Sequence, residues 1–404
     1  ASSTGFYLAY QGCEDRPLFE QFSRLYRSSH VPVCGTTVRK DSGDGRIRVG
    51  FASRYFKNHT IGRLMQGVIA GLSREDFHVT VLTVENDYDE ISEFIRNHAD
   101  DTVDLTQEIP EAIKRTVNQE LDVLFYSDIG MDPITYALAH NRLAPVQCVT
   151  WGHPVTTGIN TIDYFLSTEL AETENAAEHY TEKLVRLKTL PTYFYRPQLE
   201  TTLKTRKEFG LPQRGAIYLC PQSLFKIHPE FDLILSEILR RDPNGHIVLL
   251  DGNHPKWSEL LKQRFQRTIP EGFERILFLP RQSNHDFLNL IAVSDVMLDP
   301  IHFGGGNTSY EAFAFGIPIV MLPSQYLRGR FTLAMYRKMG LSDCVAHTFS
   351  EYVDLAVTLG TDADFREHIR GRILESCDCL FEDREAVEEI ERFLKQAVKE
   401  AKHV

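Results

Sequence analysis

The chain has 404 residues, of which 42% are hydrophobic, and at roughly 150 residues per domain this length suggests two domains with substantial cores. Its 56 acidic and 44 basic residues leave a net charge of −12, the wrong sign for a surface that binds nucleic-acid phosphates. No apolar run reaches the roughly 18 residues of a membrane span, and the segment from Ala1 to Asp15 lacks a basic stretch followed by an apolar one. The seven cysteines are an odd number, and several lie in apolar segments as free thiols would. We therefore expect a soluble cytoplasmic protein that binds neither nucleic acid nor membranes.

Residues 1–45 are predicted to form an arm or linker with a single helix. Asp15 is the expected cap, and Pro17 occupies the first turn, where proline is tolerated. The apolar face expected for this helix consists of Leu18, Phe19, Phe22, Leu25 and Tyr26.

Apolar runs alternate with helical patterns twice along the chain. The first series, in residues 46–200, has strand-like runs at Arg46 to Ser53, from Phe77, from Leu121 and from Val146, with helical spacing in Ile61 to Leu72 and around Ile91. The second series, in residues 201–380, has runs at Ala216 to Cys220, His246 to Leu250, Arg275 to Leu279, Asp295 to Leu298 and Pro318 to Leu322. Strands separated by helices predict two doubly wound, Rossmann-like α/β domains, with the boundary near residues 190–205.

The last segment, residues 381–404, is predicted to be an amphipathic helix. Its apolar stripe consists of Ile390, Phe393, Leu394, Ala397 and Val398. Packing against a domain is the preferred interpretation of this stripe, and binding of a partner is the alternative.

The strongest candidate site is the segment DPIHFGGGNTSYE, Asp299 to Glu311, between a strand and a helix. Three glycines, Gly304 to Gly306, precede Asn307, Thr308 and Ser309 at the start of the helix. This pattern lets backbone N–H groups converge on an anion, and we expect a diphosphate here. Glu311, one turn into the helix, could accept hydrogen bonds from ribose hydroxyls. The alternative is a flexible glycine loop with an ordinary helix cap, and the spacing is neither GxGxxG nor a P-loop.

Three further loops follow predicted strands. In CPQSLFKIHPEF, from Cys220, Lys226 could place its ammonium on a leaving phosphate, or it could be a surface lysine. In SRYFKNHT, His59 could act as a base or hydrogen-bond a substrate, or it could be an ordinary polar loop residue. The loop from Trp151 to Gly158, WGHPVTTG, could shape a site for a small polar ligand or form a rigid turn set by Pro154.

Other motifs do not reach the threshold for a site. Cys377 and Cys379 stand one residue apart without a second pair, so we predict no zinc site. Asp362 and Asp364 form a DxD at a helix start, where acidic residues serve as caps. No GxSxG motif is present, and no catalytic triad can be assigned by spacing.

The loops together resemble a known family. The chain is similar to the catalytic region of the O-GlcNAc transferase and SPINDLY family, glycosyltransferase family 41, from about Arg46 to about Val398. The resemblance is greatest to bacterial members of the family, which carry the segments DIGMD, Asp128 to Asp132, and RGR, Arg328 to Arg330. The matching stretches are RIRVGFASRYFKNHT, LAPVQCVTWGHPVTTGINTIDYFLS, YTEKLVRL, LCPQSLFKIHP, VSDVMLDPIHFGGGNTSYEAFAFGIPIVMLP and YVDLAVTLG.

The resemblance implies a GT-B fold, in which two Rossmann-like domains face a cleft, and an inverting transfer of a sugar from a nucleotide diphosphate without an obligatory metal or a cofactor. It places His59 beside the donor sugar and Lys226 on the diphosphate. By the same resemblance, Trp151, Gly152, His153 and Pro154 lie by the sugar. The implied phosphate-binding and ribose-binding residues of the glycine-rich segment are Gly306, Asn307, Thr308 and Glu311.

Departures from the family pattern are visible at the same positions. The animal enzyme has a histidine before two threonines where this chain has Gly306, Asn307 and Thr308, and the glutamine just upstream of the phosphate lysine is replaced by Ser223, next to Gln222. The lysine that contacts uracil aligns with Asn284, so we expect Arg281 and Gln282 near the base edge instead. The family's array of tetratricopeptide repeats does not fit into residues 1–45.

The sequence therefore predicts a transferase of GlcNAc from UDP-GlcNAc to serine or threonine hydroxyls of a protein. Within the family, transfer of fucose from GDP-fucose or of glucose to asparagine remains an alternative. A nucleotide-sugar epimerase or a non-catalytic nucleotide-sugar binder is a further alternative. The joint presence of His59 and Lys226 argues against a pure binder, and the sequence leaves the oligomeric state open.

Overall fold

The computed structural model describes residues 5–29, 45–84, 88–198 and 203–402. These residues form two compact units. Unit 1 comprises Ala1–Ala9, Cys13–Tyr195 and Glu382–Val404, and unit 2 comprises Tyr10–Gly12 and Arg196–Phe381. The chain therefore leaves unit 1 near residue 195, completes unit 2, and returns to unit 1 for its last helix.

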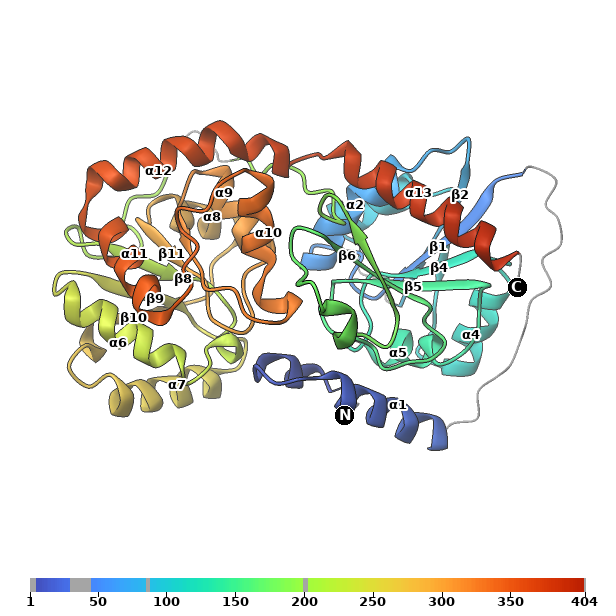
Figure 1. Cartoon of the computed structure of the whole chain (residues 1–404), viewed down its shortest axis with the longest axis horizontal. Coiled ribbons are helices and arrows are strands. Elements are labelled where there is room, and N and C mark those ends of the chain that lie inside the picture. The colour runs from blue at the N-terminus through green and yellow to red at the C-terminus, as the bar shows by residue number, and fades with distance from the viewer. Residues whose placement is uncertain (1–4, 30–44, 85–87, 199–202, 403–404) are drawn as a thin grey trace. The chain divides into compact units, whose positions relative to one another are not determined.

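Unit 1 is built on a seven-stranded sheet in the order β3-β2-β1-β4-β5-β6-β7, with every neighbouring pair parallel. Its strands are β1 Ile47–Ser53, β2 Phe77–Thr83, β3 Asp101–Asp104, β4 Val123–Tyr126, β5 Val146–Thr150, β6 Tyr164–Thr168 and β7 Lys183–Leu187. Its helices are η1 Phe6–Tyr10, whose last residue belongs to unit 2, α1 Arg16–Ser29, α2 Thr60–Gly71, α3 Glu90–Asn97, α4 Ile109–Val117, α5 Pro133–Ala139, η2 Ala176–His179 and α13 Arg384–Ala401. Figure 1 shows α2 and α13 on one side of these strands and α4 and α5 on the other, so the sheet is doubly wound.

Unit 2 is built on a five-stranded parallel sheet in the order β10-β9-β8-β11-β12. Its strands are β8 Ile217–Cys220, β9 His246–Leu250, β10 Ile276–Leu279, β11 Val296–Leu298 and β12 Ile319–Val320. Its helices are η3 Leu224–Lys226, α6 Phe231–Arg241, α7 Pro255–Thr268, η4 Phe273–Arg275, α8 Asn284–Ala292, α9 Asn307–Ala314, η5 Leu327–Gly329, α10 Phe331–Lys338, α11 Phe349–Thr361, α12 Ala363–Ser376 and η6 Cys377–Leu380. The four residues of β4 and of β8 are all buried, as expected for strands of a parallel sheet covered on both faces.

The C-terminal helix α13 is part of the core of unit 1. Val387, Ile390 and Leu394 are buried in one apolar cluster with residues of β1, β2 and α2. This supports the interpretation that the predicted apolar stripe packs against a domain. The helix is therefore not a separate segment, because its buried side chains complete the core that the sheet of unit 1 requires.

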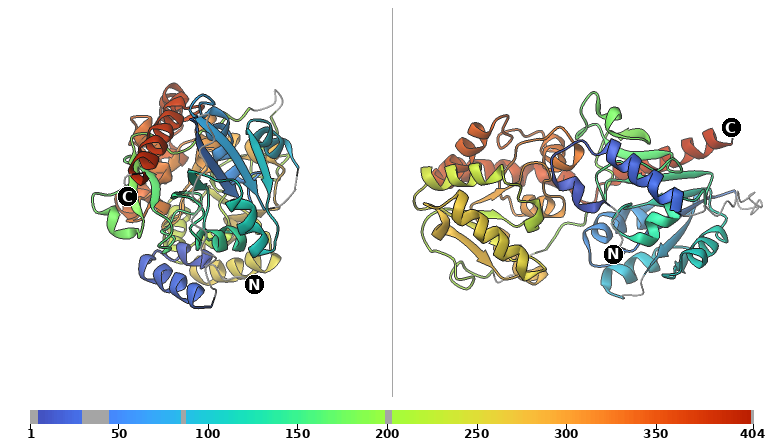
Figure 2. Two further views of the ribbon diagram at one scale, coloured as in Figure 1. Left: turned by 90° about the vertical axis from the view of Figure 1, so that its right-hand side faces the viewer. Right: turned by 90° about the horizontal axis from the view of Figure 1, so that it is seen from below.

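The N-terminal helix α1 also packs on unit 1. Tyr26 stacks on His140 with ring centroids 4.4 Å apart and meets Tyr136 edge-on at 5.2 Å, which places α1 beside α5 (Figures 1 and 2). The expected apolar face is wrong in part, because Leu18 and Leu25 are 39% and 67% exposed while Phe19 is buried. Residues 30–44 of the predicted arm, including Cys34, lie outside the described residues.

Three strands of unit 1 were not predicted from the sequence. β3 has the sequence DTVD and is polar and largely exposed, so it gives no apolar signal. β6 and β7 lie between the last predicted strand of the first series and the predicted domain boundary. The predicted strand at Pro318 to Leu322 is shorter in the structure, at Ile319–Val320.

Two of the motifs set aside in the sequence have structural roles. The Asp362 side chain accepts a hydrogen bond from the N–H of Phe365 at 2.9 Å, so the DxD does cap a helix, α12. Cys377 and Cys379 are free thiols, as are the other cysteines among the described residues. Within the described part of the chain, no helix combines the length and the apolar character needed to cross a membrane.

Candidate functional site

The glycine-rich segment connects β11 to α9 in unit 2, at the carboxyl end of the sheet. The N–H of Gly304 donates to the carbonyl of Arg328 at 2.8 Å, and the N–H of Gly305 donates to Asp299 Oδ1 at 2.6 Å. These two amides hold the loop in shape and are not available to an anion. Among the described residues, the N–H groups of Gly306 and Thr308 have no acceptor, so the N-terminal turn of α9 is the part of the loop left for a ligand.

Gly305 is required by the packing of this loop. A Cβ at this position would lie 2.6 Å from Thr308 Oγ1, 2.7 Å from Ser309 Oγ and 2.8 Å from Gln222 Nε2. A Cβ at Gly306 would meet nothing within 4 Å, because this residue faces open space. The two neighbouring glycines therefore differ in role: one permits close packing, and the other leaves room at the start of the helix.

Lys226 lies at the end of η3, the short turn that follows β8. Its Nζ donates to Gln222 Oε1 and to the carbonyl of Gly304, both at 2.9 Å. Gln222 Nε2 in turn donates to Thr308 Oγ1 at 2.6 Å. The structure thus joins four predicted site residues, Gln222, Lys226, Gly304 and Thr308, in one hydrogen-bonded network, which we call the lysine network.

The surroundings of Lys226 lower the pKa of its side chain. Burial lowers the pKa of its ammonium to about 8, and the nearby carboxylate of Asp299 acts in the opposite direction. The ammonium also lies 4.5 Å from the centroid of the Phe303 ring, a favourable cation–π distance. A cation that is partly removed from water in this way interacts strongly with any anion that reaches it.

Asp299 is a residue of this site that the sequence did not single out. It directly follows β11 and is only 2% exposed. Its Oδ2 accepts a hydrogen bond from Thr332 Oγ1 at 2.7 Å, while Oδ1 holds the Gly305 amide. Burial raises the pKa of Asp299 to about 6, against the effect of these hydrogen bonds and of Lys226. The available signal was its position, since an acidic residue directly after a buried strand sits where ligand-binding loops begin.

Three aromatic rings were also missed. Tyr10 belongs to the short N-terminal piece of unit 2 and is 6% exposed. It stacks on Phe303 with ring centroids 4.4 Å apart and meets Phe225 edge-on at 4.7 Å. Phe225 precedes Lys226 in the chain and Phe303 contacts its ammonium, so the N-terminal segment contributes through Tyr10 to the packing around the lysine network. No local pattern could reveal a contact between residues more than 200 positions apart in the sequence.

The remaining predicted residues of unit 2 lie around this network. Glu311 lies in the first turns of α9 and is 3% exposed. Ser223 is exposed in the turn before η3. Arg281 and Gln282 follow β10, the outermost strand and two strands from β8, and Gln282 Nε2 donates to the carbonyl of Pro280 at 2.6 Å. Within the described residues, neither Arg281 nor Gln282 bonds to the lysine network.

One group in the described part of the chain brings possible metal ligands together. His228, Glu230 and His302 each offer an atom within 4.8 Å of the others. His302 Nε2 lies 3.1 Å from Glu230 Oε2, so two of the three already form an ion pair when the imidazole is protonated. This direct contact between His302 and Glu230 accounts for the proximity of their side chains, and we assign no metal ion to the group.

In unit 1, His59 is the N-cap of α2, which directly follows the loop after β1. Its Nδ1 accepts a hydrogen bond from the N–H of Ile61 at 3.3 Å, which assigns the ring proton to Nε2. The ring stacks on Tyr55 with centroids 4.4 Å apart. Burial lowers the pKa of His59 to about 4, and the charges of Lys57 and Arg63 add to this effect. The side chain is therefore neutral near pH 7 and presents an N–H donor, which suits a residue that orients a ligand better than a general base.

A second group lies beside His59 on the carboxyl edge of the same sheet, in the DIGMD segment. Ser53, at the end of β1, hydrogen-bonds Asp128, which follows the adjacent β4. Burial raises the pKa of Asp128 well above its ordinary value. Arg54 pairs with Asp132 at 3.0 Å, and Asp132 caps α5. These contacts fix the loops after β1 and β4 next to one another.

The loop after β5 holds Trp151, Gly152, His153 and Pro154. A Cβ at Gly152 would lie 2.2 Å from the carbonyl oxygen of Ser127, so only glycine allows this close approach of two loops. His153 is 2% exposed and stacks on Phe6 with centroids 5.1 Å apart. The Trp151 side chain is 5% exposed. β1, β4 and β5 are neighbours in a parallel sheet, so the three loops that follow them start at the same edge of the sheet.

Comparison with known proteins identifies the family and the fold of the chain. The profile of the Glycosyl transferase family 41 matches residues 29–199 and 195–390. A relative in Arabidopsis thaliana, "Probable UDP-N-acetylglucosamine--peptide N-acetylglucosaminyltransferase SEC", is 27% identical over 80% of this chain and 34% of its own length. The relative in Hordeum vulgare with the same enzyme name and the ending SPINDLY is 31% identical over 58% of this chain and 25% of its own. The chain thus spans between a quarter and about a third of these relatives.

Solved structures share the fold. A mutant of the Thermobaculum terrenum O-GlcNAc transferase superimposes with a TM-score of 0.85 at 24% identity, over 99% of this chain and 77% of the other. Anabaena Alr3699/HepE in complex with UDP and glucose gives a TM-score of 0.57 at 13% identity, over 87% of this chain and 100% of the other. The GT-B fold predicted from the sequence is confirmed. Since the family profile covers most of the residues and the fold agrees, the chain belongs to glycosyl transferase family 41.

Proposed function

We propose that this chain transfers a sugar from a nucleoside-diphosphate donor to a serine or threonine hydroxyl of a protein, with UDP-GlcNAc as the donor. The observation that carries the proposal is the lysine network, in which the largely enclosed ammonium of Lys226 is fixed beside the N-terminus of α9. The names of the SEC and SPINDLY relatives support UDP-GlcNAc and a peptide acceptor.

In the proposed reaction, the acceptor oxygen attacks the anomeric carbon of the sugar as the bond from that carbon to the diphosphate oxygen breaks. The electron pair of the broken bond stays on the diphosphate, and the hydroxyl proton passes to a base. Negative charge therefore grows on the leaving diphosphate, and Lys226 with the free amides of Gly306 and Thr308 stabilises that charge. Positive groups that are fixed before the reaction need no reorganisation in the transition state.

We assign His59 the role of orienting the donor sugar through Nε2–H. A base with a pKa of about 4 accepts a proton only weakly, and its Nδ1 is already occupied by the Ile61 amide. Trp151, Gly152, His153 and Pro154 remain proposed sugar-side residues, and His153 would contribute through the wall it builds with Phe6. Glu311 remains the proposed ribose ligand, and Arg281 and Gln282 the proposed ligands of the base. We propose the nucleotide sugar as substrate and no resident cofactor.

The first test of this function is a thermal-shift panel with UDP, GDP, UDP-GlcNAc and GDP-fucose. We expect UDP and UDP-GlcNAc to raise Tm by about 2 °C or more at saturating concentration, because a ligand that binds only the folded state stabilises it. Stabilisation by GDP and GDP-fucose alone would assign the chain to fucose transfer instead. If no nucleotide shifts Tm, the chain is not a nucleotide-sugar enzyme of any kind.

A further experiment separates a transferase from an epimerase or a binder. Labelled donor is added to a proteome and the proteins are analysed by mass spectrometry, because only a transferase adds sugar mass to protein.

The pH dependence of the reaction is a second test. The charged form of Lys226 binds the diphosphate, and its pKa of about 8 means that this form is lost as pH rises through that value. We therefore expect kcat/KM for the donor to fall about tenfold per unit above pH 8, with no inflection near pH 6.5 from His59. The variant Lys226→Arg keeps a cation across this pH range, so the fall of kcat/KM above pH 8, the basic limb of the profile, should disappear. If the basic limb persists unchanged in Lys226→Arg, it reports the titration of another group.

A further inference from the structure

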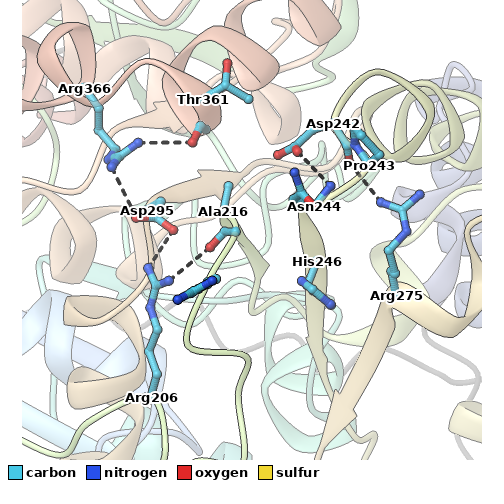
Figure 3. Close-up of a pocket in the computed structure, with 13 residues that line it drawn as sticks. Arg206, Ala216, Asp242, Pro243, Asn244, His246, Arg275, Asp295, Thr361 and Arg366 are labelled. Carbon is cyan, nitrogen blue, oxygen red and sulfur yellow. Dashed lines mark hydrogen bonds and ion pairs between the residues drawn. The ribbon is translucent and has the colours of Figure 1, made fainter.

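Unit 2 contains a pocket of about 850 Å³ at the edge of its sheet opposite to the lysine network. The pocket lies at the amino ends of four adjacent strands, since Ala216, His246, Arg275 and Asp295 stand at the starts of β8, β9, β10 and β11 (Figure 3). The lysine network, in contrast, follows the carboxyl ends of β8 and β11. The pocket is therefore separate from the site proposed for the donor.

The lining of the pocket is strongly polar and positive. Four arginines and two aspartates give a formal charge of +2 in a chain whose net charge is −12. No phenylalanine, tyrosine, tryptophan, leucine, isoleucine or valine contributes to the lining. The lining residues are Arg206, Arg214, Gly215, Ala216, Asp242, Pro243, Asn244, His246, Arg275, Asp295, Gly360, Thr361 and Arg366. Such a surface offers little to an apolar ligand and favours a small anion.

Three of the guanidinium groups are held rigidly in place. Arg206 donates to the carbonyls of Val293 and Gly215 and to Asp295, the last at 2.6 Å. Arg275 is fixed by three backbone carbonyls near the start of β9 and the end of α6. Arg366 donates to the carbonyl of Leu359 at 2.7 Å, and lies 3.6 Å from Asp295. A guanidinium carries five N–H donors, so each of these groups retains donors after its structural contacts are made.

Two further groups of the pocket are not committed to the fold in the same way. Arg214 is exposed and has no hydrogen bond or ion pair with any residue that the structure describes. His246 Nδ1 is buried and has no hydrogen-bond partner within the described residues. Burial, with the charge of Arg275, lowers the pKa of His246, so the ring is neutral near pH 7. A fixed cationic wall, an exposed arginine and a ring nitrogen without a partner among the described residues therefore line the same pocket.

We propose that this pocket binds a small, multiply charged phosphate compound with a polar remainder, the class that includes pyrophosphate and sugar phosphates. The fixed guanidiniums would accept phosphate oxygens without further ordering, and Arg214 would close over the anion from the exposed rim. Without a phenylalanine, tyrosine or tryptophan to stack a base, the pocket favours the phosphate and sugar parts of a ligand over a nucleobase. The occupant would be a second ligand of the protein, bound independently of the donor.

The test is isothermal titration calorimetry of the full chain with pyrophosphate and with glucose 6-phosphate at low ionic strength. The parent chain is titrated first, and all further proteins carry Lys226→Ala, which removes the other diphosphate site. We expect binding in this background, and a loss of about tenfold in affinity on adding Arg214→Ala, as removal of one charge-assisted contact predicts. The matched control Arg267→Ala, an exposed arginine of α7 outside the pocket, should leave the affinity unchanged.

Three outcomes would overturn the proposal. The first is absence of binding of either probe up to about 10 mM, which is weaker than any useful site. The second is equal affinity with and without Arg214→Ala. The third is binding by the chain with Lys226 intact that disappears in Lys226→Ala, because the anion would then occupy the lysine network. Since no nucleotide is used, failure here leaves the proposed function untouched, and failure of the nucleotide panel leaves this result untouched.

Discussion

Replacing Lys226 with alanine is expected to lower kcat/KM for the donor about 100-fold or more. The variant removes the ammonium that the fold holds between Gln222 and Gly304, and with it the main positive charge available to the leaving diphosphate. Loss of one fixed electrostatic donor of this kind costs about 10²- to 10³-fold in rate. The measurement is steady-state kinetics with labelled donor and a peptide acceptor, at a pH below the Lys226 pKa of about 8.

The control for this variant is Lys207→Ala. Lys207 is an exposed lysine of the same unit, and its side chain has no hydrogen bond or ion pair with the described residues. It should leave kcat/KM within about twofold of the parent and keep the parent Tm to within about 2 °C. Lys226→Ala should lower the transition of unit 2 by several degrees, because it leaves the buried Asp299 without its counter-charge, so the kinetics are measured at a temperature at which both variants are folded. Wild-type turnover in Lys226→Ala would remove this residue from the mechanism, whereas a matching loss in Lys207→Ala would point to a general charge effect.

Replacing Asp299 with alanine is expected to lower the free energy of unfolding of unit 2 by about 3 kcal/mol. The change leaves the Gly305 amide and the Thr332 hydroxyl without their acceptor and removes the counter-charge of Lys226. Buried polar groups that lose their partner cost about 1–3 kcal/mol each, and breaking a buried charge pair costs more. Differential scanning calorimetry should show the transition of unit 2 several degrees lower. Asp364→Ala, an exposed acidic residue in the first turn of α12, should cost less than about 1 kcal/mol.

A second variant, Asp299→Asn, separates the charge of this residue from its shape. The amide preserves the size of the side chain, so most of the stability should return. The negative charge of Asp299 raises the pKa of Lys226, and its removal should therefore move the basic limb of kcat/KM below pH 8. An Asp299→Ala protein as stable as the parent, or an Asp299→Asn protein with an unmoved limb, would show that Asp299 does not organise this loop.

The sequence predicted the parts of the molecule whose signal is local. Continuous apolar runs identified the central strands β1, β4, β8 and β9, and the strand-to-helix position of Lys226 and of Gly304 to Thr308 identified the lysine network. The edge strand β3 was missed because its residues are polar, and no burial forces an apolar pattern on it. The stripe of the C-terminal helix predicted that it packs against a domain, but an amphipathic stripe does not say which unit it packs on, and the structure places it in the core of unit 1.

The site also contained features that no local pattern records. The glycine-rich segment was expected to let backbone amides converge on an anion, and the structure shows that Gly304 and Gly305 use theirs to fix the loop on Arg328 and Asp299. Tyr10 reaches Phe225 and Phe303 only through the tertiary structure. The neutral state of His59 depends on its burial against Tyr55 and on two nearby cations, and none of these follows from the presence of a histidine in the loop.

The return of the chain to unit 1 through α13 makes unit 2 an insertion within unit 1, and this connectivity has a consequence for the order of folding. During synthesis, all of Arg196–Phe381 is added to the chain before Val387, Ile390 and Leu394 exist to fill their places in the core of unit 1. Until α13 has been synthesised, the core of unit 1 is incomplete and the apolar surface around α2 is exposed to water. Unit 2 does not depend on α13, so we expect it to be able to fold before unit 1 is complete. Substitutions of the buried residues of α13 should thus lower the yield of folded protein by impairing unit 1, which is synthesised first and carries His59.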